Sequence, residues 1–326
     1  MIKVEHLSKR YGTVYALDDI SFEIGSGEVV GLLGPNGAGK STTMNIVTGY
    51  LSSTAGEVTV DGTSILGSPA EAKRKIGYLP EQPPLYQEMT VEEYLGFVYE
   101  LKHCTLPRAP HIDEVLDATH LRDVRRRLIR NLSKGYRQRV GIAQALIGDP
   151  PVLIFDEPTV GLDPKQIIEI RSLLRTLGRR HTVILSTHIL SEVQAVCERV
   201  IIINRGRIVA DTKTEEIARA AADARAYRLK IAGPEREVTA LLRRCAGVGG
   251  VEVGEQREGD ARVYTLTAAA GVDVRKPVFF ACAERGYPIL EFAPQGGDLE
   301  EVFLRLVERG SADDVKKAGT RKGRRA

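Results

Sequence analysis

The sequence predicts an α/β protein that carries an inserted helical subdomain and ends in a small α+β domain. Short apolar stretches such as 28–33 and 151–155 alternate with helical segments, which is typical of a parallel sheet. Helical periodicity dominates residues 90–148, and beyond residue 222 the pattern changes. Because 326 residues are too many for one ordinary core, we expect separate domains. The expected parts are 1–222, 223–310 and a basic, disordered tail over 311–326.

A glycine-rich loop follows the first apolar stretch. It fits the pattern Gly, four residues, Gly-Lys-Ser/Thr, between an expected strand and an expected helix over 42–49. Its N–H groups and the helix N-terminus can bind phosphate oxygens, whereas a chance glycine-rich turn would not need both flanking elements. We therefore expect a P-loop NTPase that binds a nucleoside triphosphate, with Lys40 on the β- and γ-phosphates and Ser41 on Mg²⁺. The expected nucleotide-binding residues are Gly34, Pro35, Asn36, Gly37, Ala38, Gly39, Lys40, Ser41 and Thr42.

Strand patterns precede this loop. Two strands joined by a turn at Tyr11-Gly12 are expected, followed by a third strand over Ser21–Ile24. Tyr11 has two interpretations that its position leaves open. The ring either covers a sheet edge or stacks on a nucleobase.

Two acidic residues follow the apolar stretch 151–155. Asp156 and Glu157 would lie at the carboxyl end of a parallel strand, where α/β folds bind ligands. They would also suit a helix N-cap with an acidic first turn, but the phosphate-binding loop favours a catalytic pair. Asp156 is then the expected Mg²⁺ ligand, and Glu157 polarises a water molecule against the γ-phosphate.

Other polar residues lie near the ends of expected helices and strands. Ser133 and Gly135 open a helix and form either a plain N-cap or an anion site. Asp163 precedes Pro164 and caps the next helix. His188 follows a strand over 182–185 and can donate to a γ-phosphate, although a lone histidine is more often structural.

The expected helical insertion is rich in arginine near its centre. The five arginines over 122–130 have no aromatic residues among them, so a solvated face or an acidic partner is favoured over nucleic acid. The expected helices of this region cover 90–102 and 112–121, and a third is opened by the segment 131–139 and runs to about residue 147.

Taken together, these motifs resemble the ATP-binding subunit of an ABC transporter, in that family's order, over residues 1 to about 222. Residues 79–86 and 132–139 look like the type-two exporter branch, similar to the gliding-motility and sodium-efflux ATPases. The resemblance implies catalytic roles for Lys40, Glu157 and His188, and adenine stacking by Tyr11. It also implies an in-trans signature over Ser133, Lys134, Gly135 and Tyr136, and a D-loop acid at Asp163.

Two motifs depart from the family pattern. Lys134 and Tyr136 replace the middle glycine and the glutamine of the usual Leu-Ser-Gly-Gly-Gln signature. The Q-loop glutamine usually follows a Gly-Tyr-aliphatic-Pro strand end, but here Glu81 stands in that place and Gln82 comes one residue later. We rank Glu81 first by register and keep Gln82 beside it.

The C-terminal third has its own pattern. The order β-α-β-β-α-β suggests a ferredoxin-like domain that serves packing, dimerisation or regulation. No histidine lies beyond residue 188, and no acidic cluster there has a catalytic pattern. The expected elements are strands 226–232, 250–254, 262–267 and 287–292, and helices 234–245, 273–285 and 298–308.

Composition limits the remaining possibilities. The longest strictly apolar run has six residues and the N-terminus lacks a signal-peptide core, so we expect no membrane span. The four cysteines have no metal-ligand spacing and are expected as isolated thiols. The net charge is +3, made up of +4 in residues 311–326 and −1 in the rest of the chain, a balance that does not suggest a nucleic-acid-binding body. That tail either contacts anionic lipid or only aids solubility.

The expected function is therefore that of a cytoplasmic ATPase subunit held at the inner face of the cell membrane by a permease. ATP and Mg²⁺ are the expected cofactors. One phosphate loop and one signature per chain imply a head-to-tail dimer with a second copy or a homologue. The alternative is a soluble ABC ATPase that acts on nucleic acid or ribosomes, but such relatives commonly carry two ATPase halves or a coiled-coil insertion. A nucleotide-gated module with negligible turnover is disfavoured by Glu157.

Overall fold

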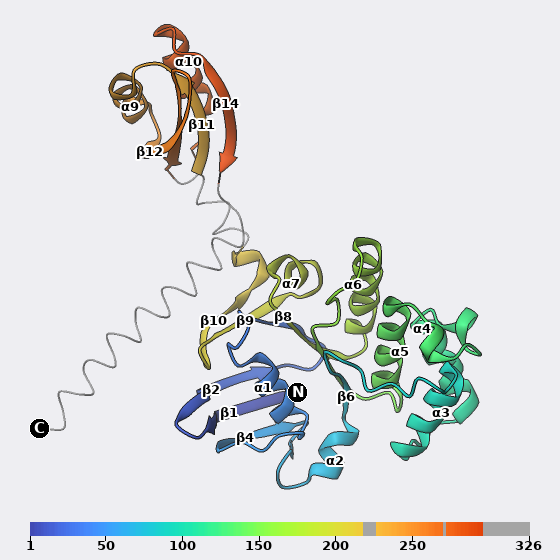
Figure 1. Cartoon of the computed structure of the whole chain (residues 1–326). Helices are drawn as coiled ribbons and strands as arrows, with labels where there is room; N and C mark the ends of the chain where they lie inside the picture. The colour runs from blue at the N-terminus through green and yellow to red at the C-terminus, as the bar shows by residue number, and fades with distance from the viewer. Residues whose placement is uncertain (218–225, 270–271, 296–326) are drawn as a thin grey trace, which may run out of the picture. The chain divides into compact units, whose positions relative to one another are not determined.

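The computed structural model describes residues 1–217, 226–269 and 272–295. The chain forms two compact units, Met1–Thr214 and Glu215–Ala326 (Figure 1). The division at Thr214 comes before the expected boundary at residue 222. Each unit is built around its own core.

A six-stranded sheet positions the loops of the first unit. Its order is β10-β9-β3-β8-β7-β6, and only β10 runs antiparallel to its neighbour. The central strands β3, β7 and β8 are buried along their whole length, as expected for apolar strands covered on both faces. Because parallel strands end at one edge, the segments after β3, β7 and β8 meet there. The strands are β3 (Val29–Leu33), β6 (Ile76–Leu79), β7 (Val152–Asp156), β8 (Thr182–Thr187), β9 (Arg199–Asn204) and β10 (Arg207–Lys213).

A second, antiparallel sheet has the order β2-β1-β4-β5. The expected third strand over Ser21–Ile24 is not separate, because β2 runs on to Ile24. Register shifts between β1 and β2 keep the two strands paired along this length. The strands are β1 (Ile2–Tyr11), β2 (Val14–Ile24), β4 (Ala55–Val60) and β5 (Thr63–Ser64).

Helix α1 (Lys40–Val47) joins the two sheets. It packs against β2 and β4 on one side and against β7 and β8 on the other. Its buried Met44, Ile46 and Val47 belong to a core that both sheets share. Other helices of this α/β part are α2 (Pro69–Arg74), α6 (Pro164–Gly178) and α7 (Leu190–Val196).

The helical subdomain comprises α3 (Val91–Leu101), α4 (Arg108–Ala118) and α5 (Lys134–Leu146), which Figure 1 shows gathered on one side of the unit. A capping box between Thr90 and Glu93 starts α3. At its other end, Lys102 Nζ donates to the carbonyls of Gln144, Ala145 and Ile147, at 2.9–3.3 Å. An ammonium group at a helix C-terminus is favourable, so Lys102 fixes α5 against α3.

The second unit has the expected order of elements, β-α-β-β-α-β, within its described residues. Its antiparallel sheet has the order β12-β13-β11-β14. Alternate residues of β11, Tyr227, Leu229 and Ile231, are buried in a core that includes α9 and α10. The expected helix 298–308 and the tail lie outside the described residues. The elements are β11 (Ala226–Ala232), α9 (Glu235–Arg244), β12 (Val248–Glu258), β13 (Ala261–Ala268), α10 (Arg275–Glu284) and β14 (Ile289–Gln295).

All four cysteines are unpaired. Cys197 and Cys282 are buried, whereas Cys104 and Cys245 are only partly so. Burial raises the pKa of the Cys282 thiol to about 11, aided by the nearby Cys245. The Cys282 thiol is therefore a protonated, buried group at neutral pH.

Candidate nucleotide-binding site

The glycine-rich loop joins β3 to α1, as the sequence predicts. Gly37 and Gly39 have φ angles of +77° and +113°, a region that favours glycine. Gly34 needs glycine for another reason, because a Cβ atom there would overlap the carbonyl oxygen of Ile203 on β9. The loop is also tied to the start of β10, where the Gly206 N–H donates to the Ala38 carbonyl at 2.8 Å.

Lys40 lies inside the loop rather than pointing into solvent. Its Nζ donates to the Gly34 carbonyl at 2.8 Å and lies 3.6 Å from the Glu157 carboxylate. The side chain is almost fully buried. A buried ammonium group with these partners is paired, and it connects the phosphate loop to the acidic residue after β7.

Glu157 and His188 come from neighbouring strand ends and face each other. His188 Nδ1 lies 3.0 and 3.1 Å from the two carboxylate oxygens of Glu157. Glu157 is buried and has a φ of +49°, while its N–H donates to the Ser186 carbonyl on β8. A non-glycine residue in this region costs of order 1 kcal/mol and is concentrated at functional sites.

Asp156 is the last residue of β7 and is buried. Its Oδ1 has no hydrogen-bond partner in the described part of the chain, and neither has the Ser186 hydroxyl. Burial raises the pKa of the Asp156 carboxyl above its usual range, although the Ser186 and Ser41 hydroxyls near it act in the opposite direction. The unpartnered buried Asp156 oxygen and the nearby Ser41 hydroxyl are suitable ligands for a hard cation.

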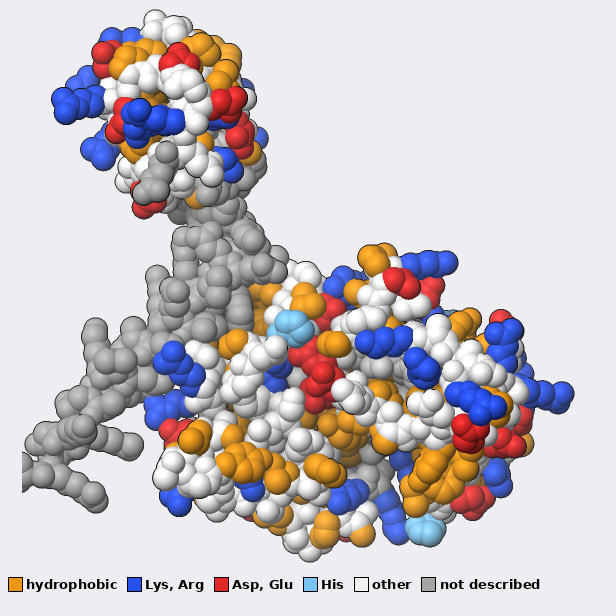
Figure 2. Space-filling view, in the orientation of Figure 1, with side chains coloured by type: hydrophobic (Ala, Val, Ile, Leu, Met, Phe, Trp, Pro, Cys, Tyr) orange, Lys and Arg blue, Asp and Glu red, His pale blue; other side chains and the backbone are white. Residues whose placement is uncertain are grey.

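A pocket of about 370 Å³ brings together part of the phosphate loop with Glu81, Glu157 and His188, whereas the predicted Tyr11 and Asp156 are not among its lining residues. Figure 2 shows a histidine and acidic side chains gathered near the middle of the first unit. Ala16 and Val160 also line the pocket; nothing in their sequence context marked them, since both are small apolar residues in loop or strand surroundings. The full lining is Ala16, Asn36, Gly37, Gly39, Lys40, Ser41, Thr42, Glu81, Glu157, Val160 and His188.

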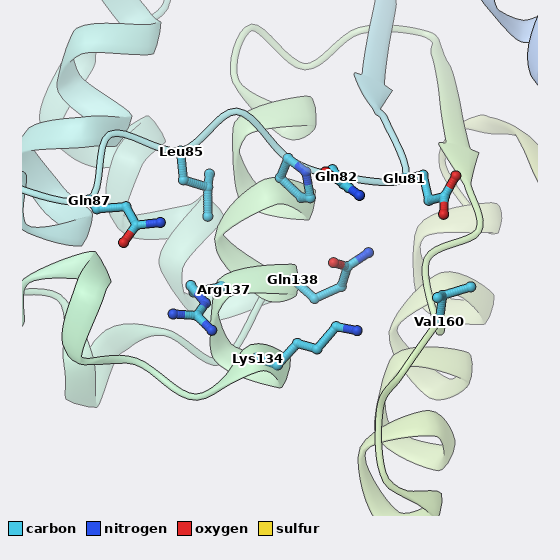
Figure 3. A pocket seen from close by; sticks show the side chains of 9 residues that line it. Glu81, Gln82, Leu85, Gln87, Lys134, Arg137, Gln138 and Val160 are labelled. Atoms are coloured by element: carbon cyan, nitrogen blue, oxygen red, sulfur yellow. The ribbon is translucent and has the colours of Figure 1, made fainter.

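The structure separates the two Q-loop candidates. Glu81 lines the phosphate-loop pocket, whereas Gln82 does not and lines a neighbouring pocket of about 420 Å³. Figure 3 shows this second pocket, with Glu81 next to Val160 and with Lys134, Arg137 and Gln138 projecting from α5. The two pockets share Glu81 and Val160, so they are adjacent.

The predicted signature residues lie at the start of α5 and do not line the phosphate-loop pocket of their own chain. Ser133 is the N-cap, and its hydroxyl accepts from the Tyr136 N–H at 3.4 Å. A Cβ on Gly135 would lie 2.6–2.8 Å from the Gln166 amide group, so this glycine permits a close approach by α6. A Cβ atom on Gly161 would likewise overlap Lys134 Nζ, so that glycine leaves room for the ammonium group.

Asp163 and Tyr11 occupy more exposed positions. Asp163 caps α6, accepting from the Gln166 N–H at 2.9 Å. Tyr11 ends β1 with 52% of its surface exposed, and Lys9 Nζ lies 5.3 Å from the ring centroid. The Tyr11 ring is therefore not part of the core and is available for stacking.

Two further observations concern the described residues 1–217, 226–269 and 272–295. None of their helices combines the length and the apolar character that crossing a membrane requires. They also contain no group of three or more His, Cys, Asp or Glu side chains arranged to hold a metal ion.

Comparisons with known proteins identify relatives of this chain. Residues 17–160 match the ABC transporter family. The linearmycin resistance ATP-binding protein LnrL of Bacillus subtilis is 33% identical over 96% of this chain and 100% of its own length. The bacitracin transport ATP-binding protein BcrA of Bacillus licheniformis is 30% identical over 95% of this chain and 98% of its own.

A solved structure supports the same relationship for the first unit. A dimeric ATP-binding cassette in a post-hydrolysis state, with ADP and Pi bound, is 30% identical with a TM-score of 0.61. The match covers 66% of this chain and 99% of that one.

Proposed function

This chain belongs to the ATP-binding subunits of ABC transporters, and we propose that it hydrolyses ATP to drive export of a substrate through a separate membrane permease. The observation that carries the proposal is the single pocket formed by the phosphate loop, Glu157 and His188. Relatives named for linearmycin resistance and bacitracin transport align over nearly the whole chain, which supports an export role. We place the protein at the inner face of the cell membrane, through that permease.

Two chains would form each complete site. The phosphate loop binds ATP in one chain, and Ser133 and Gly135 of a second chain contact the γ-phosphate. The capped start of α5 supports this arrangement, because a helix N-terminus with a hydroxyl suits an anion. Lys134, Tyr136 and the D-loop Asp163 would lie at the same dimer contact. Binding of two ATP molecules closes the dimer, and hydrolysis removes the shared anion and allows it to open.

The chain's own groups would perform the chemistry as follows. Lys40 neutralises charge on the β- and γ-phosphates. The Glu157 carboxylate polarises the attacking water and takes its proton. His188 donates to the γ-phosphate and orients Glu157, because its Nδ1 already contacts that carboxylate.

Asp156 and Ser41 would hold Mg²⁺. Asp156 Oδ1 is buried and unpartnered, and Ser41 lines the pocket, so both oxygens suit a cation that usually takes one or two protein ligands with phosphates. When bound, Mg²⁺ neutralises charge on the β- and γ-phosphate oxygens.

Glu81 is proposed as the Q-loop residue. Glu81→Ala should lower ATP turnover about tenfold, the equivalent of one charged hydrogen bond, because its side chain lines the phosphate-loop pocket. The matched variant Gln82→Ala should change turnover by less than about twofold. Steady-state ATPase assays compare the two, and a larger loss for Gln82→Ala would reverse the assignment.

Tyr11 is proposed to stack on the adenine ring. Tyr11→Ala should weaken ATP binding by about 1–3 kcal/mol, the usual value of a base–aromatic contact. Tyr50→Ala is a suitable control, since Tyr50 is also an exposed tyrosine and has no proposed contact with the nucleotide. Direct titration with a fluorescent ATP analogue measures the affinity of both variants. Equal affinities would show that Tyr11 does not stack on the base and has a structural role instead.

The export proposal is tested by isolating the partner. Tagged Glu157→Gln protein is purified from detergent-solubilised cells with ATP and Mg²⁺, and the recovered proteins are identified. A stoichiometric polytopic membrane protein that stimulates the wild-type ATPase would support the proposal. Recovery of ribosomes or nucleic acid without a membrane protein would favour the soluble alternative.

The C-terminal unit is proposed as an accessory module. The tail, which lies outside the described residues, is proposed to contact anionic lipid.

A further inference from the structure

A buried carboxylate on α7 connects the segments that carry Glu157 and His188. Glu192 is only 2% exposed. Its Oε1 accepts from the Thr159 hydroxyl at 2.6 Å, and its Oε2 accepts from the Thr187 hydroxyl at 2.8 Å. Both hydroxyls belong to buried side chains. One carboxylate thus uses both oxygens to join the loop after β7 to the end of β8.

The two threonines lie close to the catalytic pair along the chain. Thr159 follows Glu157 by two residues, and Thr187 directly precedes His188. The Thr187 hydroxyl also accepts from the Ile189 N–H at 3.1 Å. The same oxygen therefore restrains the backbone on both sides of His188.

The His188 side chain has little packing to hold it in place. It is 43% exposed, whereas its partner Glu157 is buried. An imidazole in that position depends on its backbone for orientation, and the Thr187 contacts provide the anchor. Arg171 of α6 lies 3.9 Å from Glu192, so the buried charge has a cationic neighbour.

We propose that Glu192 is a positioning residue that sets the contact between Glu157 and His188. The inference rests on the proposed function, since it assumes that His188 acts in hydrolysis. Glu192 touches neither ATP nor water in this role. It acts by holding Thr159 and Thr187, and so the two strand ends, at a constant separation.

The test first removes one threonine hydroxyl at a time with Glu192 in place, and then changes Glu192 itself to Gln and to Ala. Thr187→Val and Thr159→Val are close in shape to the native residue. Thr119→Val is the matched control, because Thr119 is fully buried and its hydroxyl bonds only within its own helix region, to the Val115 carbonyl. Each variant is made in the full-length chain with and without His188→Ala, and kcat and KM for ATP are measured.

Thr187→Val is expected to lower kcat about tenfold with KM changed by less than about twofold, because a lost hydroxyl contact misplaces His188 without altering the phosphate loop. In the His188→Ala background, Thr187→Val should lower kcat by less than about twofold, because the effects of two residues that act through one another are not additive. Thr119→Val should leave kcat unchanged. Glu192→Gln should retain more activity than Glu192→Ala, because an amide still fills the site and makes part of the network.

Other results would overturn the inference. Thr187→Val could lower kcat equally with and without His188→Ala, or by no more than Thr119→Val does. Either result would show that Glu192 has a purely structural role. If Thr187→Val does not fold, Thr159→Val decides the question by the same comparison. Unchanged turnover in His188→Ala alone would instead contradict the assigned role of His188, and with it the positioning role that depends on it.

Discussion

Glu157→Gln is expected to lower ATP turnover by about 10²–10⁴, the usual contribution of a general base. An amide has almost the same shape and can still contact His188, whose Nδ1 lies 3.0–3.1 Å from the native carboxylate. It cannot take a proton from water. The variant also loses the negative charge 3.6 Å from Lys40, so the ammonium group is freer to bind a phosphate. ATP affinity should therefore be retained or increased.

The measurements are steady-state ATPase activity and the elution volume in gel filtration with and without ATP. Glu157→Gln should accumulate an ATP-dependent dimer, because the step that removes the shared γ-phosphate is blocked. Glu198→Gln, at an exposed position before β9, is the control for loss of one acidic charge. Turnover that stays within about twofold of wild type would show that Glu157 is not the base.

Features that depend on neighbouring residues were predictable from the sequence. The phosphate loop requires only a strand, a glycine pattern and a helix start within residues 28–49, and the structure has all of them. The meeting of the segments after β3, β7 and β8 follows from one rule, that parallel strands end at the same edge of a sheet. Glu157 and His188 could be placed in one crevice for that reason.

Features that depend on close tertiary contact could not be predicted. Glu192 has no pattern that marks it, because its partners Thr159 and Thr187 approach it only after α7 packs beside the sheet. The approach of Gln166 to Gly135 likewise joins segments whose separation no local spacing determines. The ranking of Glu81 over Gln82 rests on the register of the family motif alone, because no periodicity in that proline-rich loop specifies which side chain faces the pocket.

The glycines of the phosphate loop should respond very differently to one added methyl group. At Gly34 a Cβ would overlap the Ile203 carbonyl on β9 and would also lie 3.1 Å from the Ala38 Cβ. Neither neighbour is a flexible side-chain end, so the loop or the strand must move. Gly34→Ala is therefore expected to abolish ATP binding and to destabilise the first unit by about 3 kcal/mol, the upper part of the usual overpacking range.

Gly37→Ala is the matched comparison in the same loop. A Cβ there meets nothing within 4 Å, and the cost is limited to a side chain at a φ of +77°, about 1–2 kcal/mol. Urea unfolding followed by far-UV circular dichroism and ATP titration measure both variants. If Gly37→Ala proved as damaging as Gly34→Ala, backbone conformation rather than the approach of β9 would determine why this loop needs glycine. If Gly34→Ala alone loses ATP binding, β9 is a wall of the nucleotide site, and the sheet itself shapes the phosphate loop.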